Sequence, residues 1–136
     1  MRRQKKDYFV RQSKIQNYRS RSAFKLIEIN KKFNFLKKNT FLLDLGSAPG
    51  GWSQVANKII TTGKILAVDI MPMEKIKNVD FIVGDLNNYE ISNKIFSYFN
   101  RKINVVVSDM ATNTTGNKNL DSYRTGELCL NAMDLA

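Results

Sequence analysis

An apolar run that leads straight into glycines, FLLDLGSAPGGW at residues 41–52, constrains the fold of this chain more than any other stretch. The run from Phe41 to Leu45 has the length of a buried strand in a parallel sheet. Three glycines follow between positions 46 and 51, and a helical pattern begins near Trp52. This order brings backbone N–H groups up to a ligand, because glycine has no side chain to block close approach. It predicts a nucleotide-like ligand, although a tight connection without a ligand has the same pattern.

Acidic residues close three further predicted strands and indicate which ligand is meant. Asp69 follows the run 64–68, Asp85 follows 80–84, and Asp109 follows 103–108. A nicotinamide dinucleotide site needs one acid, ~20 residues after the glycines, for its ribose. S-adenosylmethionine suits all three acids better, because it presents ribose hydroxyls, an adenine amine, an ammonium and a sulfonium, and has no pyrophosphate. The acids therefore predict S-adenosylmethionine as cofactor, with an NAD-dependent oxidoreductase as the alternative.

Helices are predicted at residues 22–33, before the first strand, at 52–60 and 91–99, between strands, and at 123–136, after the last strand. The helix at residues 22–33 is predicted to have Ser20 or Ser22 as its N-cap. In the last strand, Val105, Val106 and Val107 are β-branched and apolar, which predicts burial on both faces of the sheet. Alternating strands and helices predict a Rossmann-like parallel α/β sheet with right-handed crossovers. With 136 residues the chain is one domain, short for a complete doubly wound enzyme.

The charge of the chain is strongly positive and uneven. It has 22 Lys and Arg against 12 Asp and Glu, a net charge of +10, and no histidine. Such a balance implies an anionic partner, most often nucleic acid, and the lack of histidine excludes His-containing zinc sites. No apolar run approaches the ~20 residues of a membrane span. Residues 1–21 are predicted to contact RNA, because Tyr8, Phe9 and Tyr18 are interleaved there with basic residues. These are Arg2, Arg3, Lys5, Lys6, Arg11, Lys14, Arg19 and Arg21. A solvated tail and an organelle transit peptide are the alternatives.

Three segments, taken in order, resemble the FtsJ/RrmJ-type ribosomal RNA 2′-O-methyltransferases. They are RSRSAFKL at residues 19–26, DLGSAPGGWSQ at 44–54 and SDMA at 108–111, and the similarity extends over essentially the whole chain. The resemblance implies a class I S-adenosylmethionine-dependent methyltransferase fold, with its first four strands ordered 3-2-1-4. It also implies methylation of a uridine ribose in large-subunit ribosomal RNA, by a cytoplasmic and monomeric enzyme that uses neither metal nor membrane. Residues 1–21 would then be an RNA-contacting segment, and residues 22–136 the N-terminal part of the methyltransferase domain.

The resemblance also implies roles for single residues. Lys25 and Asp109 match the first two members of the family's Lys-Asp-Lys-Glu catalytic set, whereas spacing alone favours Lys25 as a surface lysine paired with Glu28. The cofactor positions that match are Gly50, Trp52, Asp69, Asp85 and Asp109. Thr112 stands where the family usually has proline. The second lysine and the glutamate belong to strands after Ala136, so we expect a truncated methyltransferase, or alternatively a catalytically incomplete fragment that binds RNA and cofactor.

Overall fold

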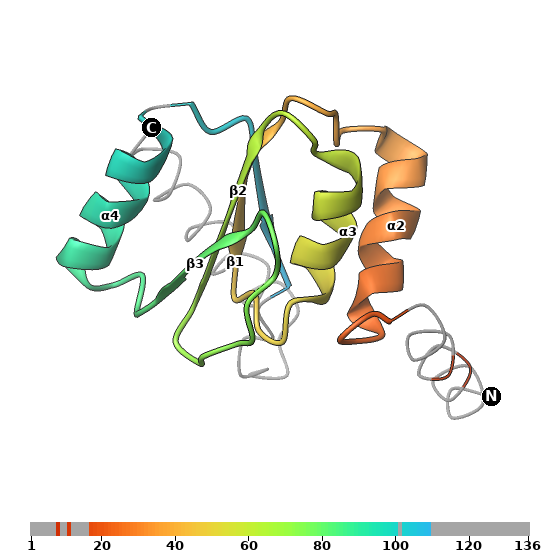
Figure 1. Cartoon of the computed structure of the whole chain (residues 1–136), viewed down its shortest axis with the longest axis horizontal. Helices are drawn as coiled ribbons and strands as arrows, with labels where there is room; N and C mark the ends of the chain where they lie inside the picture. The colour runs from red at the N-terminus through yellow and green to blue at the C-terminus, as the bar shows by residue number, and fades with distance from the viewer. Residues whose placement is uncertain (1–7, 9–10, 12–16, 101, 110–136) are drawn as a thin grey trace, which may run out of the picture.

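Four parallel strands form one sheet in the computed structural model, which describes Tyr8, Arg11 and residues 17–100 and 102–109 (Figure 1). The described strands lie in the order β3-β2-β1-β4, which confirms the predicted order. Their bounds are β1 Phe41–Leu45, β2 Lys64–Asp69, β3 Asp80–Val83 and β4 Val105–Ser108. β1 pairs with both β2 and β4, so the glycine-containing turn leaves from the middle of the sheet.

Three described helices cover the two faces of this sheet. They are α2 Ser22–Phe33, α3 Gly51–Ile59 and α4 Tyr89–Phe99. In Figure 1, α2 and α3 lie together on one side of the strands and α4 lies on the other. The prediction for residues 22–33 is confirmed, whereas α4 begins two residues earlier than predicted because the Asn88 side chain accepts a hydrogen bond from the N–H of Glu90.

The core divides between the two faces because side chains alternate along each strand. Leu42 and Ile65 pack with Trp52 and Val55 of α3, on the face that α2 also covers. On the opposite face, the cluster beneath α4 contains Leu43, Leu45, Leu66, Val68, Ile91, Ile95 and Phe99. Asp44 falls on the α3 face by the same alternation, and only 1% of its surface is exposed. A carboxyl group is therefore built into the apolar layer between β1 and α3.

Two details of the predicted elements are wrong. The N-cap of α2 is Arg21, with no side-chain cap, because the hydroxyls of Ser20 and Ser22 bond to each other over 2.7 Å. In β4 only Val107 is buried, while Val105 and Val106 are half-buried. The sheet described has β1 on one side of β4 and no strand on the other, which accounts for their exposure.

The strand register brings the predicted acids to one edge of the sheet. Leu45 aligns with Val68 of β2 and with Ser108 of β4, and Asp69 aligns with Val83 of β3. Gly46, Asp69, Gly84 and Asp109 therefore lie at or next to the carboxyl ends of neighbouring strands, where open α/β sheets bind ligands. The predicted loop at residues 111–119 and the helix at 123–136 lie outside the described residues. In the part of the chain that is described, no helix is long and apolar enough to cross a membrane.

Candidate active site

The glycine loop, residues 46–50, connects β1 to α3 with a backbone that only glycine adopts easily. Gly46 has φ 69° and Gly50 has φ 119°, both in the left-handed region. Gly50 is also the N-cap of α3, and a Cβ atom there would come within 2.9 Å of Ile76 Cδ1. The N–H groups of Gly46 and Ser47 donate to the carbonyl of Val68. The loop is thus fixed against the end of β2 by its own backbone.

Asp69 adds a second connection between the same two strand ends. Its Oδ2 accepts the N–H of Ala48 over 2.8 Å, and its Oδ1 accepts the N–H of Met71 over 3.0 Å. Each carboxylate oxygen has a further lone pair, so both can accept another donor, such as a ribose hydroxyl. The predicted cofactor residue Asp69 therefore also holds the glycine loop.

Asp44 is a buried acid that was not among the predicted site residues. Ser53 of α3 donates its hydroxyl proton to Asp44 Oδ2 over 2.7 Å. Burial raises the pKa of Asp44 to about 7; the Ser53 hydrogen bond opposes this, and the nearby charges of Asp109 and Asp69 add to it. An acid at the second-to-last position of an apolar strand, two residues before a glycine, is the sequence signal that could have identified it.

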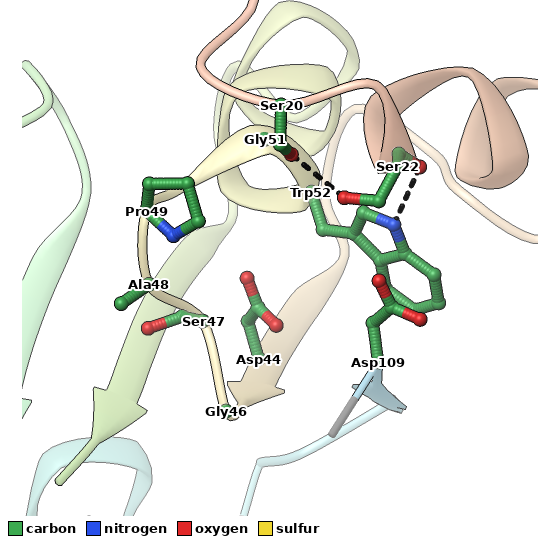
Figure 2. Close-up of a pocket in the computed structure, with 10 residues that line it drawn as sticks. All are labelled: Ser20, Ser22, Asp44, Gly46, Ser47, Ala48, Pro49, Gly51, Trp52 and Asp109. Atoms are coloured by element: carbon green, nitrogen blue, oxygen red, sulfur yellow. Dashed lines mark hydrogen bonds between the residues drawn. The ribbon is translucent and has the colours of Figure 1, made fainter. Parts of the chain in front are cut away.

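A small cavity of about 40 Å³ lies between β1, the start of α2 and the start of α3. Figure 2 shows Asp44 at its centre, with the glycine loop on one side and Trp52 and Asp109 on the other. The lining residues are Ser20, Ser22, Asp44, Gly46, Ser47, Ala48, Pro49, Gly51, Trp52 and Asp109. Two carboxyl groups and several hydroxyl and carbonyl groups suit a cationic ligand with hydrogen-bond donors.

Trp52 forms a wall of this cavity and joins two helices. Its Nε1 donates to the carbonyl of Ser22 over 2.7 Å, and 7% of the residue is exposed (Figure 2). Gly51 lets the helices approach, because a Cβ there would collide with the Ser20 hydroxyl. The start of α2, where the Arg19–Leu26 segment lies, is therefore held against the glycine loop.

Lys25 forms an ion pair with Asp109, one of the residues that line the cavity. Lys25 Nζ lies 3.6 Å from Asp109 Oδ1, with 64% of the lysine side chain and 35% of the aspartate side chain exposed. The ion pair of Lys25 is thus with Asp109, and the expectation from spacing, a pair with Glu28, is wrong. The pair joins α2 to the end of β4 and leaves an ammonium group accessible to a bound substrate.

The predicted cofactor residues are not all in one place. Trp52 and Asp109 line the cavity, and Gly50 and Asp69 shape the glycine loop beside it. Asp85 is exposed after β3, where its Oδ1 accepts the N–H of Asn87 over 2.9 Å. A ligand that contacts both the cavity and Asp85 would have to be elongated. Among the described residues, no group of three or more His, Cys, Asp or Glu side chains could hold a metal ion.

Comparison with known proteins agrees with this arrangement. Residues 18–136 match the FtsJ-like methyltransferase family. The chain is 46% identical over 134 residues to ribosomal RNA large subunit methyltransferase E of Pelagibacter ubique, covering 98% of this chain and 66% of that protein. It is 40% identical to the protein of the same name from Acinetobacter baumannii, covering 100% of this chain and 64% of the relative. The chain thus spans about two thirds of the length of these curated relatives.

Solved structures show the same fold. A ribosomal RNA methyltransferase, described as putative, from Plasmodium falciparum superposes with a TM-score of 0.69 at 37% identity, covering 84% of this chain and 68% of that one. The methyltransferase MycE of the mycinamycin pathway superposes with a TM-score of 0.51 at 18% identity, covering 65% of this chain and 27% of that one. The second likeness concerns the fold alone.

Proposed function

The chain belongs to the FtsJ-like methyltransferase family, and from this premise we propose that it forms the cofactor-binding part, and half of the catalytic set, of a ribosomal RNA 2′-O-ribose methyltransferase. The proposed reaction transfers a methyl group from S-adenosylmethionine to the 2′-hydroxyl of a uridine ribose in large-subunit ribosomal RNA. The observation that carries the proposal is the ion pair between Lys25 and Asp109, because Asp109 also lines the cavity that contains Asp44 and the glycine loop.

The residues present fit S-adenosylmethionine. Asp44 is a buried carboxyl group whose raised pKa reflects the cost of keeping a negative charge out of water and near Asp109 and Asp69. An ammonium or sulfonium group beside Asp44 and Asp109 would lower that cost. We propose that Asp69 receives the ribose hydroxyls, that Asp85 lies towards the adenine, and that Trp52 and Gly50 bound the methionine end. The cofactor supplies an electrophilic methyl group.

The methyl acceptor is proposed to bind at the Lys25–Asp109 pair. In-line transfer needs a hydroxyl oxygen held about 3–3.5 Å from the methyl carbon and able to lose its proton during attack. Lys25 can donate to the ribose oxygen, and Asp109 orients the lysine through their ion pair. These are the first two members of the family's Lys-Asp-Lys-Glu set; the proton acceptor would be the second lysine, on a later strand in the family. A catalytically incomplete fragment that binds cofactor and RNA is therefore the second candidate.

Ribosomal RNA is proposed as the partner because the relatives are named large-subunit ribosomal RNA methyltransferases. The RNA-contacting segment is proposed as residues 1–21, with residues 22–136 as methyltransferase domain. Exposed Arg21, four residues before Lys25, would place positive charge near the acceptor site, and exposed Arg11 belongs to the same basic segment. We further propose that the enzyme acts in the cytoplasm as a monomer, without a metal ion.

A chimera tests the proposed activity without requiring this chain to act alone. Residues 1–136 would be joined to the remaining third of the Pelagibacter ubique relative and incubated with methyl-labelled S-adenosylmethionine and unmethylated large-subunit ribosomal RNA. The expected result is label on a ribose 2′-oxygen. This is recognised because a 2′-O-methyl group protects the adjacent phosphodiester bond from alkaline hydrolysis. A folded chimera that binds cofactor and transfers no label, beside an active relative, would contradict the proposal. Tighter binding of NAD than of S-adenosylmethionine would instead support the oxidoreductase alternative.

A further inference from the structure

The side chain of Arg19 is hydrogen-bonded to two loops of the site. Among the described residues of the predicted RNA-contacting segment, only Arg19 makes such contacts. Its Nη1 donates to the carbonyl of Pro49, over 3.1 Å, and to the carbonyl of Glu74. Its Nη2 donates to the carbonyl of Lys75 over 2.9 Å. The guanidinium group thus makes three hydrogen bonds to backbone, and none of these three acceptors is a carboxylate.

The three carbonyls belong to the two loops that flank Asp69. Pro49 is in the glycine loop, and Glu74 and Lys75 are in the second loop, which we define as residues 70–79 between β2 and β3. The Ser47 hydroxyl and Met73 sulfur make another contact between these loops, at 3.8 Å. The planar guanidinium fork can bridge several carbonyls in a fixed geometry, whereas a lysine ammonium group is a point charge on a flexible stem.

The backbone of Arg19 is also held by hydrogen bonds, so the guanidinium group extends from a fixed position. Its N–H donates to Gln54 Oε1 of α3 over 2.7 Å, and Gln54 Nε2 donates to the carbonyl of Asn17 over 3.0 Å. The side chain also packs on Gly50, where a Cβ would lie 3.2 Å from Arg19 Nη1. Arg19 therefore contacts the last two residues of the glycine loop, Pro49 and Gly50, and is anchored to α3 through Gln54.

We propose that Arg19 is a positioning residue for the cofactor and not a phosphate contact. By joining Pro49 to the second loop, it sets the spacing between the glycine loop and the loop that follows Asp69, where an adenosyl group would enter. Exposed Arg21, two residues later, has no such described hydrogen bonds and stays available to RNA. This inference rests on the proposed S-adenosylmethionine site.

Three variants of the full chain test the inference: Arg19→Ala, Arg19→Lys and, as matched control, Arg21→Ala. Calorimetry would give the Kd for S-adenosylmethionine, and binding to a large-subunit ribosomal RNA fragment at several salt concentrations would give the RNA affinity. We expect both Arg19 variants to raise the cofactor Kd about tenfold or more, because lysine keeps the charge and loses the fork. Arg21→Ala should leave the cofactor Kd unchanged and weaken RNA binding.

The outcomes separate the alternatives. Arg19 variants that lose only RNA affinity would overturn the inference and return Arg19 to the RNA-contacting segment. Full recovery of cofactor affinity in Arg19→Lys would overturn positioning by the guanidinium group, because a point charge would then be sufficient. A lowered melting temperature with a normal cofactor Kd would also overturn it, because the role would then be purely structural. If Arg19→Ala does not fold, Arg19→Lys, which keeps most of the alkyl stem, carries the test. Wild-type chain that binds no S-adenosylmethionine would overturn the proposed function and this inference together.

Discussion

The glycine loop and the Lys25–Asp109 pair differ in how they are built. The loop is held by backbone hydrogen bonds to Val68, by the carboxylate of Asp69 and by the fork of Arg19. The pair consists of two partly exposed side chains from different elements, 3.6 Å apart. A site whose geometry is set before a ligand arrives loses little entropy on binding, whereas exposed side chains must still be ordered. We infer that the cofactor half is preorganised and that the acceptor half is completed by substrate.

The largest expected effect concerns the buried acid of the cofactor half. Because the pKa of Asp44 is about 7 in the folded chain and 3.8 ordinarily, the folded state holds this proton more tightly than the unfolded state. The free energy of unfolding of the free protein should therefore fall as pH rises from about 4 to about 7, by roughly 4 kcal/mol at about 1.4 kcal/mol per pKa unit. Urea unfolding across this range measures the effect.

Asp44→Asn is the control, because the amide oxygen can still accept from Ser53 and does not titrate. The contribution of Asp44 to the pH dependence should vanish in that variant. Equal pH dependence in both proteins would contradict the buried, protonated carboxyl group.

Lys25→Ala tests the acceptor half. In the chimera we expect the rate of methyl transfer to fall by about 10²-fold or more, because the ribose hydroxyl loses the donor that orients it. Single-turnover transfer to ribosomal RNA measures the rate. Glu28→Ala, one turn along the same helix, should transfer methyl at the wild-type rate. A similar loss in both variants would show that the face of α2, and not Lys25, is responsible.

Asp69→Ala tests the link between the glycine loop and the ribose. We expect weaker binding of S-adenosylmethionine by about 1.5–3 kcal/mol, because a charge-assisted acceptor is lost and the Ala48 N–H loses its partner. Asp80→Ala, at the other end of the neighbouring strand, removes a carboxylate bonded to Tyr98 and should leave the cofactor Kd unchanged. Unchanged affinity in Asp69→Ala, or tighter binding of NAD than of S-adenosylmethionine, would refute the cofactor assignment.

The smallest effect is expected from one charge of the RNA-contacting segment. Arg11→Ala should reduce the slope of log K against log salt for single-stranded RNA by about 0.7, the contribution of one phosphate contact. Filter binding at four salt concentrations gives the slope. An unchanged slope would favour a solvated tail for this part of the chain.

The sequence was sufficient for the sheet and for the acids at its edge, because burial on both sides makes strands such as β2, with residues 65–68, continuous apolar runs. It was insufficient for the tertiary contacts. Spacing along α2 predicted a pair between Lys25 and Glu28, whereas the tertiary fold brings Lys25 to Asp109, just after the end of β4. Arg19 reads as one of many basic residues, because nothing local shows that three distant carbonyls converge on it.

The separation of the two halves is tested most directly by one calorimetric titration, in which S-adenosylmethionine is added to wild-type chain and to Lys25→Ala under identical conditions. If the cofactor half is preorganised by its own backbone, the two dissociation constants should agree within about twofold. A Kd for Lys25→Ala raised about tenfold or more, as expected for Asp69→Ala, would show that the halves form one coupled site and would contradict the account.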